Sequence, residues 1–337
     1  MSSRNRGVLL VVQSPIGIAP LLQIYSNCLS KNEITILCLG SRGLHEYLEK
    51  LELKCNLLFV KPEAYSSGKF SYIYRLAQQR KFIKNFCLEW DEVYITSLYQ
   101  DIYAISIANE CIKNNIKIYL VKTDLSNLER YAKKCNIYKK LVVFFLSKVI
   151  SIAIGLEVTL NNLSGKYIYG YKNQESIPIL DIQVKDSVYK NFGIEISGDS
   201  GENILLFESL GEDGSHYMNY RRRLEGLIEQ LSKLGTVYIK PHPTYGASKF
   251  LENNLMYRFL NGSTPAAMIN LKQFKMIVGI DSAALKEVRH HNVISVIDSF
   301  DFTDYTVKDS FKTYLQNEAP SKIKFISIEE IENYFNN

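Results

Sequence analysis

The chain has 337 residues, of which 46% are hydrophobic and 22% charged, which is enough for a large core and, by length, for about two domains. Its formal net charge of +5 is too mild to indicate nucleic-acid binding, and it suits an anionic substrate or a position near anionic lipid. Six cysteines without a C-x-x-C pair predict reduced thiols packed as small apolar residues and argue against a zinc site.

The first half of the chain alternates short apolar segments, rich in β-branched and aromatic residues, with stretches of helical length. Strands are expected at residues 7–13, 33–40, 55–60, 91–97 and 117–124, and helices at 19–31, 44–51, 72–88 and 101–114. Strand, helix and strand at this spacing predict a parallel sheet with crossover helices.

The longest apolar stretch, residues 141–156 (LVVFFLSKVISIAIGL), contains Lys148 and follows Lys139 and Lys140. It falls short of the roughly 18 uninterrupted apolar residues of a membrane span. We expect a buried core helix here, and a helix lying on a membrane surface is the alternative. The apolar run 8–12 is too short for a signal-peptide core, so it is expected to be the first strand, and a periplasmic binding protein is disfavoured.

Residues 161–200 hold turn residues and interrupted apolar runs, and are expected to link an N-terminal domain at 1–160 to a C-terminal domain at 201–337. In the second half, strands are expected at 203–210, 236–240, 274–280 and 293–298, and helices at 218–234, 282–291 and 326–335. Ser327 and Glu330 are expected to form a capping box at the start of the last helix. The predicted fold is α/β, with two doubly wound, Rossmann-like domains that face a cleft.

Several common catalytic patterns are missing from the sequence. There is no G-x-x-x-x-G-K-[ST], no G-x-G-x-x-G after the first strand, no G-x-S-x-G and no H-E-x-x-H. There is also no Asp-x-Asp pair, which holds a divalent metal in many nucleotide-sugar enzymes. The sequence therefore favours chemistry without a metal or a bound cofactor.

Two polar groups stand where predicted strands of the second half end. Residues 212–214 (EDG) follow one strand, and His242 lies between two prolines after the next. Because parallel neighbours end at the same edge of a sheet, the Asp213 carboxylate and the His242 imidazole can meet there, which suits acid–base catalysis. Taken singly, EDG is equally typical of a turn ahead of a helix cap at Ser215, and His242 of a rigid loop end. Together they favour a catalytic pair.

A third group lies at Gly279 and Ser282, where the strand at 274–280 gives way to a predicted helix. A helix N-terminus with small residues leaves backbone N–H groups for a phosphate, and an ordinary serine N-cap is the alternative. His216, His290 and His291 are interpreted as surface or capping groups, the last two at the end of a helix, where positive charge is favourable.

These motifs, in order Glu212-Asp213-Gly214, His242-Pro243 and Ser282, resemble those of the bacterial GT-B sialyltransferases of the lipooligosaccharide sialyltransferase family, glycosyltransferase family 52. The opening VVQSPIGIAPLLQ, with Ser14 and Pro15, is also similar to the first strand and turn of that family. The chain departs from the family where Ala283 follows Ser282, in place of a second hydroxyl residue. It departs again where AAMIN follows Pro265, in place of a nearby acidic residue.

The resemblance implies an inverting, metal-independent transfer of sialic acid from CMP-sialic acid to a galactose-type hydroxyl of a bacterial surface glycan, such as O-antigen, capsule or lipooligosaccharide. It implies that Asp213 is the base and that His242 offsets charge on the departing phosphate. The residues expected to bind the donor are Glu212, Gly214, Lys240, Pro243, Gly279 and Ser282. Acceptor contacts are expected from loop ends of the first domain: Gln13, Ser14, Ser97 and Tyr99.

The expected partners are CMP-sialic acid and a glycan or glycolipid acceptor, without nucleic acid. The expected location is the cytoplasm, with peripheral contact at the inner face of the cytoplasmic membrane and a homodimeric state left open. Two alternatives remain. One is the transfer of another sugar from another nucleotide donor, and the other is a non-catalytic polysaccharide-assembly protein that keeps the fold.

Overall fold

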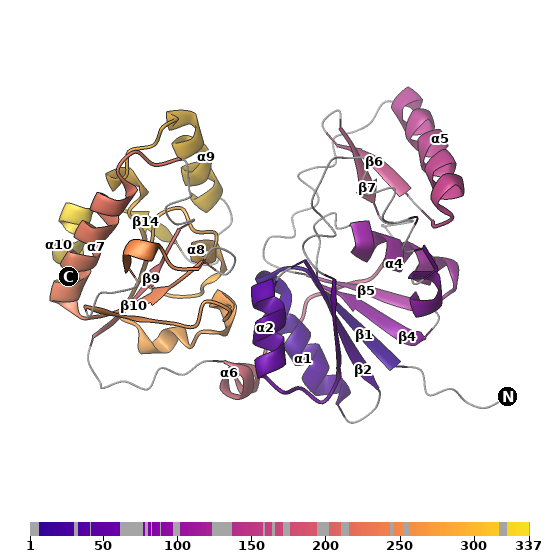
Figure 1. Cartoon of the computed structure of the whole chain (residues 1–337), viewed down its shortest axis with the longest axis horizontal. Helices are drawn as coiled ribbons and strands as arrows, with labels where there is room; N and C mark the ends of the chain where they lie inside the picture. The colour runs from indigo at the N-terminus through magenta and orange to yellow at the C-terminus, as the bar shows by residue number, and fades with distance from the viewer. Residues whose placement is uncertain are drawn as a thin grey trace. The chain divides into compact units, whose positions relative to one another are not determined.

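The computed structural model divides into two compact units, residues 1–188 and 189–337 (Figure 1). The structure describes residues 7–29, 33–40, 42–60, 77, 80–81, 83–87, 89–96, 102–122, 137–157, 159–163, 166–170, 176–193, 202–209, 216–242, 246–251, 256–316 and 322–336. No helix within these ranges is long and apolar enough to cross a membrane.

The first unit is built on a six-stranded sheet in the order β3-β2-β1-β4-β5-β8, in which every pairing is parallel. The strands are β1 (Gly7–Val12), β2 (Ile34–Leu39), β3 (Asn56–Val60), β4 (Trp90–Ile95), β5 (Lys117–Val121) and β8 (Ile179–Leu180). The chain builds one half of the sheet outward from β1 and then continues from β4 to the other edge, so the sheet is doubly wound. Every residue of β1 and β2 is buried, as expected for central strands covered on both faces.

The helices of the first unit are α1 (Ile18–Cys28), α2 (Arg42–Lys50), α4 (Ile102–Lys113) and α5 (Ile137–Ile154), and an antiparallel hairpin of β6 (Thr159–Leu163) and β7 (Lys166–Gly170) follows α5. Two polar side chains of α4 hold the segment that leaves α5. Glu110 Oε1 accepts a hydrogen bond from the Glu157 backbone N–H at 2.7 Å, and Asn109 Nδ2 donates to the Glu157 carbonyl at 3.4 Å.

The second unit repeats this plan with a parallel sheet in the order β11-β10-β9-β12-β13-β14. The strands are β9 (Asn203–Phe207), β10 (Thr236–Lys240), β11 (Tyr257–Phe259), β12 (Met276–Gly279), β13 (Val293–Ser295) and β14 (Ile323–Phe325). The helices are α7 (Tyr220–Leu234), α8 (Ala284–Glu287), α9 (Tyr305–Gln316) and α10 (Ile331–Asn336), while α6 (Asp186–Phe192) crosses the boundary between the units. The strand orders of the two sheets confirm the predicted fold class of two doubly wound α/β domains.

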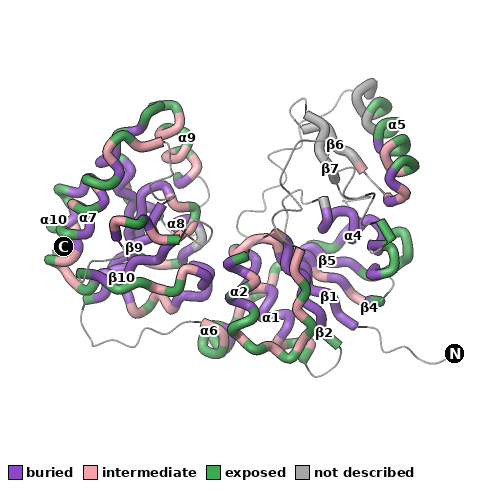
Figure 2. Tube along the Cα trace, in the orientation of Figure 1, coloured by how far each residue is buried: buried purple, intermediate pink, exposed green. Residues whose placement is uncertain are grey.

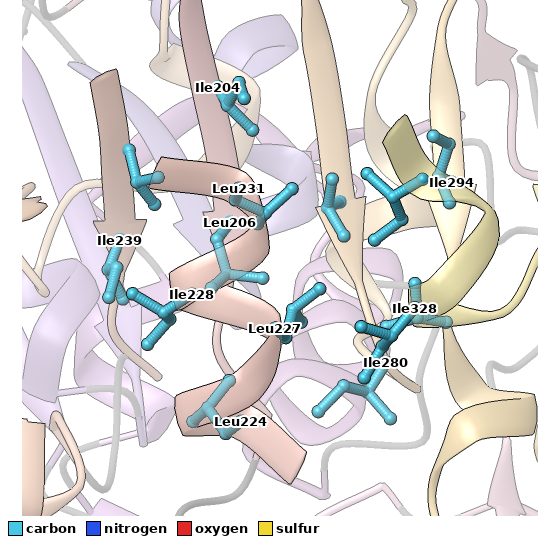
Figure 3. Close-up of a cluster of buried hydrophobic side chains, with 14 of the residues drawn as sticks. Ile204, Leu206, Leu224, Leu227, Ile228, Leu231, Ile239, Ile280, Ile294 and Ile328 are labelled. Atoms are coloured by element: carbon cyan, nitrogen blue, oxygen red, sulfur yellow. The ribbon is translucent and has the colours of Figure 1, made fainter. Parts of the chain in front are cut away.

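The core of the second unit lies on both faces of its sheet because side chains alternate along each strand. Ile204 and Leu206 of β9 pack with one cluster, whereas Leu205 and Phe207 pack with the other. Figure 3 shows the first cluster, in which the apolar stripe of α7 meets the strands; its members on α7 include Leu224, Leu227, Ile228 and Leu231. This stripe has the helical spacing expected from the sequence.

All nine predicted strands are present, each within three residues of its expected bounds. The capping box of Ser327 and Glu330 is also confirmed, and it leads through a 3-10 turn (Ile328–Glu330) into α10. Of the helix expected at 72–88, only residues 77, 80–81 and 83–87 are described, and all are helical. Five of the six cysteines are described and are free thiols, while Cys135 lies outside the described residues.

The boundary between the two units falls after Val188, and the middle segment of the chain supplies β7 and β8, the latter paired with β5 at the edge of the first sheet. Two expectations differ from the structure. The helix expected at 282–291 is wrong beyond Glu287, since Val288 is already extended. The expectation of a buried core helix at 141–156 is wrong for most of α5, whose large apolar side chains are exposed (Figure 2).

His290 and His291 therefore do not end a helix. His290 is half-buried, with Nδ1 accepting from the Asn292 backbone N–H at 3.1 Å and Nε2 donating to the Phe274 carbonyl at 3.0 Å. Burial is the main reason that its pKa is lowered. It holds the start of β12 to the turn before β13, which is a structural role.

Candidate functional site

The candidate site lies at the carboxyl edge of the second sheet, where three neighbouring strands end in register. Phe207, the last residue of β9, pairs with Lys240 at the end of β10 and with Gly279 at the end of β12. The order of the sheet reverses between β9 and β12, which makes this edge a topological switch point. Doubly wound sheets bind their ligands at such a point because loops diverge there and leave a crevice.

A hydrogen bond joins the two loops at the switch point. Ser209, two residues past β9, donates its hydroxyl to Oδ1 of Asp281, two residues past β12. Both side chains are buried, with 3% and 7% of their surface exposed. The Tyr217 hydroxyl lies close by: burial, followed by the Asp281 carboxylate, raises its pKa, so this phenol stays neutral and can donate. Sequence reasoning missed Ser209 and Asp281, because they are 72 residues apart and the order of the strands that brings their loops together was not predicted.

His242 lies on the loop that follows β10, and its side chain is half-buried. The loop is closed by a hydrogen bond from the Gly246 N–H to the His242 carbonyl at 2.9 Å, and Gly246 has φ +75°, a conformation that favours glycine. Burial and the positive charge of Lys240 lower the pKa of His242, while Asp281 opposes them. The imidazole is therefore mostly neutral at pH 7 and can donate one N–H or accept a proton.

Lys240, expected to bind the donor, is buried, with 4% of its surface exposed. Its ammonium donates to the Pro241 carbonyl and to the Gly262 carbonyl, each at 2.8 Å. Burial lowers its pKa to about 8. Two of its three donors are thus spent on backbone carbonyls, and in this structure Lys240 holds the start of the His242 loop against the loop after β11.

Glu208 holds the other end of the same loop. It is buried, with 2% of its surface exposed, and its Oε1 accepts from the Ser248 backbone N–H at 2.9 Å. Its own N–H donates to the Lys240 carbonyl at 3.1 Å. The segment from 241 to 248 is therefore anchored at both ends by charged side chains that lie beside the switch point.

The loop after β11 adds polar groups that the sequence analysis did not single out, because β11 is only three residues long and was not predicted. Asn261 Oδ1 accepts from the backbone N–H of Ser263 at 3.0 Å and from its hydroxyl at 2.7 Å. Thr264, with 2% of its surface exposed, follows in the same loop. Since β11 neighbours β10, this loop extends the polar edge beyond His242.

Gly279 and Ser282 lie at the carboxyl end of β12, as expected. A Cβ at Gly279 would lie 3.0 Å from Leu285 Cδ1, so the absent side chain lets α8 pack against the strand. The Ser282 hydroxyl accepts from the Ala284 N–H at 3.3 Å. Because α8 has only four residues, its dipole is small and the Ser282 hydroxyl itself is the group best able to meet a ligand.

The acidic motif Glu212-Asp213-Gly214 and Pro243 lie outside the described residues, so their expected roles stay predictions. The nearest described residues bracket them: Ser209 precedes the acidic motif by three positions, and His242 directly precedes Pro243.

In the first unit, Gln13 and Ser14 follow β1 and are half-buried, whereas Ser97 and Tyr99 lie outside the described residues. The Ser14 carbonyl accepts from the Gly17 N–H at 3.1 Å, which forms the turn into α1. Gly17 approaches Thr96, the residue after β4, so closely that a Cβ would lie 2.5 Å from its Oγ1. Gln13 and Ser14 therefore stand at the switch point of the first sheet, between β1 and β4.

The described residues contain no group of three or more His, Cys, Asp and Glu side chains that could hold a metal ion. A pocket of about 570 Å³ lies in the first unit, lined among others by Gly7, Glu33, Asn56 and Trp90. These residues belong to the amino-terminal ends of the strands, opposite to the edge that carries Gln13 and Ser14, so we do not assign the pocket to the site.

No family model and no curated protein matches the sequence. Among solved structures, the chain is similar to E. coli heptosyltransferase WaaC with ADP, at 11% identity over 98% of each chain and a TM-score of 0.45. It is also similar to UDP-GlcNAc 2-epimerase from Neisseria meningitidis bound to UDP-GlcNAc, at 11% identity, 98% of this chain, 90% of that chain and a TM-score of 0.49. A third is E. coli ADP-heptose heptosyltransferase II, at 12% identity, 98% and 97% coverage and a TM-score of 0.42. Likeness at this level transfers no activity, and the fold assignment rests on the two sheets themselves.

Proposed function

We propose that the protein is a glycosyltransferase that uses a nucleotide-activated sugar, and specifically that it transfers sialic acid from CMP-sialic acid to a galactose-type hydroxyl of a bacterial surface glycan with inversion and without a metal. The observation that carries the proposal is the convergence of Ser209, His242 and Asp281 on one edge of the second sheet, at its switch point. The sialic acid donor rests on the motif resemblance of the sequence.

The reaction needs a base because a sugar hydroxyl is a poor nucleophile. In the proposed step the acceptor oxygen bonds to the anomeric carbon of sialic acid and its proton passes to the Asp213 carboxylate. The bond from that carbon to the phosphate oxygen of CMP breaks, and its electron pair leaves with CMP. Attack opposite the leaving group inverts the anomeric centre.

The departing CMP gains negative charge, and His242 is the group proposed to offset it. Its lowered pKa makes the free imidazole a neutral donor, and an approaching phosphate raises the pKa again, which favours uptake of a proton, so that the imidazolium offsets the charge of the leaving group. The clamps from Lys240 and Glu208 fix the loop, so the imidazole loses little freedom when the donor binds. The Ser282 hydroxyl is proposed as a second phosphate contact.

Asp281 and Ser209 are proposed as positioning residues. They tie the loop that leads to the acidic motif to the loop that carries Ser282. Fixing these two loops relative to each other sets the distance between base and leaving group, which controls the rate of a displacement.

The decisive experiment is to incubate the purified full chain with CMP-sialic acid and a panel of galactose-terminated acceptors, with and without a chelator, and to measure CMP release and product. We expect transfer that a chelator does not abolish. Asp213→Asn and His242→Gln should each lower turnover by roughly 10²–10⁴-fold. The matched controls Asp309→Asn and His291→Gln, which change exposed residues of the same types, should leave it unaltered.

Each alternative has its own outcome in this assay. Release of UDP or ADP from another sugar nucleotide, with the same sensitivity to Asp213→Asn and His242→Gln, would retain the site but replace the donor. Absence of transfer from every donor, together with a polysaccharide phenotype that survives both substitutions, would replace the enzyme by an assembly protein.

A further inference from the structure

The outer surface of α5 is the most apolar exposed surface among the described residues. Fifteen large apolar side chains are exposed among the described residues of the chain, and seven of them lie on this one helix: Leu141, Val142, Phe144, Phe145, Leu146, Val149 and Ile152. Figure 2 shows the helix exposed along much of its described length. Clusters of this kind mark surfaces that bind a partner or a membrane.

The helix is oriented against the usual amphipathic pattern. The side of α5 that meets the first unit carries Ser147, Ile150 and Ile154, spaced three and four residues apart, and Ser147 and Ile154 are buried. A surface helix of a water-soluble protein normally turns its largest apolar side chains inward. Here a narrow, partly polar stripe attaches the helix, and the phenylalanines point outward. This orientation is favourable when the outer face of α5 lies in an apolar medium instead of water.

The sequence of α5 and of the residues that precede it is basic. Residues 130–156, between Glu129 and Glu157, include six basic residues and no acidic one. Within the face, Lys148 is exposed and its Nζ lies 5.7 Å from the centre of the Phe144 ring. A lysine among outward apolar side chains can keep its ammonium at a headgroup while its stem and the neighbouring rings enter the lipid.

We propose that α5 docks the protein on the surface of a membrane that carries anionic lipids, with Phe145 and Ile152 inserted at the headgroup boundary and Lys148 at the phosphates. Because one stripe of α5 packs on the core of the first unit, the helix lies on the bilayer. A second copy of the chain is a poorer occupant: in a symmetric pair this patch would meet itself, and the basic residues would face their own copies. The proposal is independent of the proposed enzymatic function.

The test is co-sedimentation of the full chain with vesicles of phosphatidylcholine alone and of phosphatidylcholine mixed with phosphatidylglycerol. We expect binding to the mixed vesicles that weakens with added salt, since exposed charges are screened. The double variant Phe145→Ser/Ile152→Ser should weaken binding by at least about ten-fold, because two inserted side chains are lost. Lys148→Glu should weaken it roughly five-fold or more.

The matched control is Tyr305→Ser, which removes an aromatic side chain with 68% of its surface exposed, against 66% for Phe145, from the second unit. It should bind the vesicles as the unaltered chain does. All the substituted side chains are exposed, so the variants should unfold at the same temperature as the unaltered chain. Lys148→Glu provides the charge test even if the double variant fails to fold.

Three outcomes would overturn the proposal. One is no binding to the mixed vesicles, and another is binding that neither α5 variant changes. The third is a dimer in analytical ultracentrifugation that the double variant dissociates, because a second copy would then cover the face. Release of CMP with a water-soluble acceptor should be equal in all these variants, so failure of docking and failure of the proposed enzymatic function are distinguished.

Discussion

The hydroxyl of Ser209 donates a hydrogen bond to Asp281, and through it the loops after β9 and β12 are tied together at the point where the strand order of the second sheet reverses. Asp281 also acts on His242. Burial and Lys240 lower the pKa of this imidazole, and Asp281 acts in the opposite direction. The protonation of the candidate catalytic histidine therefore depends on its burial and on two charges of opposite sign, Lys240 at the end of β10 and Asp281 after β12, which are the two strands that flank β9.

Removing either charge should move the pKa of His242 in a known direction. Asp281→Asn removes a negative charge that raises the pKa of His242, so His242 should titrate at a lower pH than in the unaltered chain. Lys240→Met removes a positive charge that lowers this pKa, so His242 should titrate at a higher pH. The measurement is an NMR titration of the ring protons of the five histidines, with the His242 signal assigned by its loss in His242→Gln.

The two variants control each other, because a nonspecific loosening of the site would expose the imidazole and raise its pKa in both. Shifts of the same sign would therefore contradict the electrostatic account. If transfer depends on His242, the limb of the pH–rate profile that it controls should move with its pKa in each variant.

The buried carboxylate of Glu208 should contribute to stability mainly through one hydrogen bond. Glu208→Ala leaves the Ser248 N–H buried without its acceptor, which should lower the free energy of unfolding by about 1–3 kcal/mol. Glu208→Gln keeps a carbonyl oxygen in the same place and should recover most of the loss. Chemical denaturation of the full chain measures both, and equal losses would show that the charge, not the hydrogen bond, matters.

Lys240 should make stability depend on pH in an alkaline window. Its pKa is about 8 in the folded chain against an ordinary value of 10.5, so between these values the unfolded chain holds a proton that the folded chain has released. The free energy of unfolding therefore rises with pH across this window, by about 3 kcal/mol in total. Below pH 8 the buried ammonium is charged, and the full cost of its desolvation lowers the stability of the folded chain.

Lys240→Met isolates this contribution from the tyrosines, which titrate in the same range. From pH 8 to 10.5, the unfolding free energy of the unaltered chain should rise relative to that of the variant. Below pH 8 the difference between the two should not change with pH. Parallel profiles for the two proteins would contradict the buried position of the ammonium.

The sheets were predictable because their central strands are continuous apolar runs that end in polar loops. β1 and β9 are buried at every residue, and their sequences, GVLLVV and NILLF, carry that pattern without help from context. Five strands escaped prediction. Three of them, β8, β11 and β14, have two or three residues each. Strands that short are defined by the neighbour they pair with, and no periodicity can develop within them. The other two, β6 and β7, pair only with each other in a hairpin at the start of the stretch that was expected to be a linker.

The candidate site was predictable at its strand ends and not in its detail. His242 and Ser282 stand where expected because a strand fixes where its loop begins. The inward turn of Lys240 depends on the Gly262 carbonyl, 22 residues away in the loop after β11, a strand that was not predicted. The outward face of α5 was also mispredicted, since apolar composition gives the size of an apolar surface without saying which medium covers it.

Gly17 should be intolerant of any side chain, because the turn between β1 and α1 passes against the end of β4. A Cβ at this position would lie 2.5 Å from Thr96 Oγ1 and 2.6 Å from Thr96 Cβ. Gly17→Ala should therefore destabilise the chain by about 1–3 kcal/mol, the usual cost of overpacking. The matched control is Gly226→Ala in α7, where no atom lies within 4 Å of the added carbon. There alanine should stabilise the helix by roughly 0.5–1 kcal/mol. Changes of opposite sign in the unfolding free energy would separate close packing from backbone entropy, and a harmless Gly17→Ala would mean that the turn at Gly17 and Thr96 do not approach as closely at the first switch point.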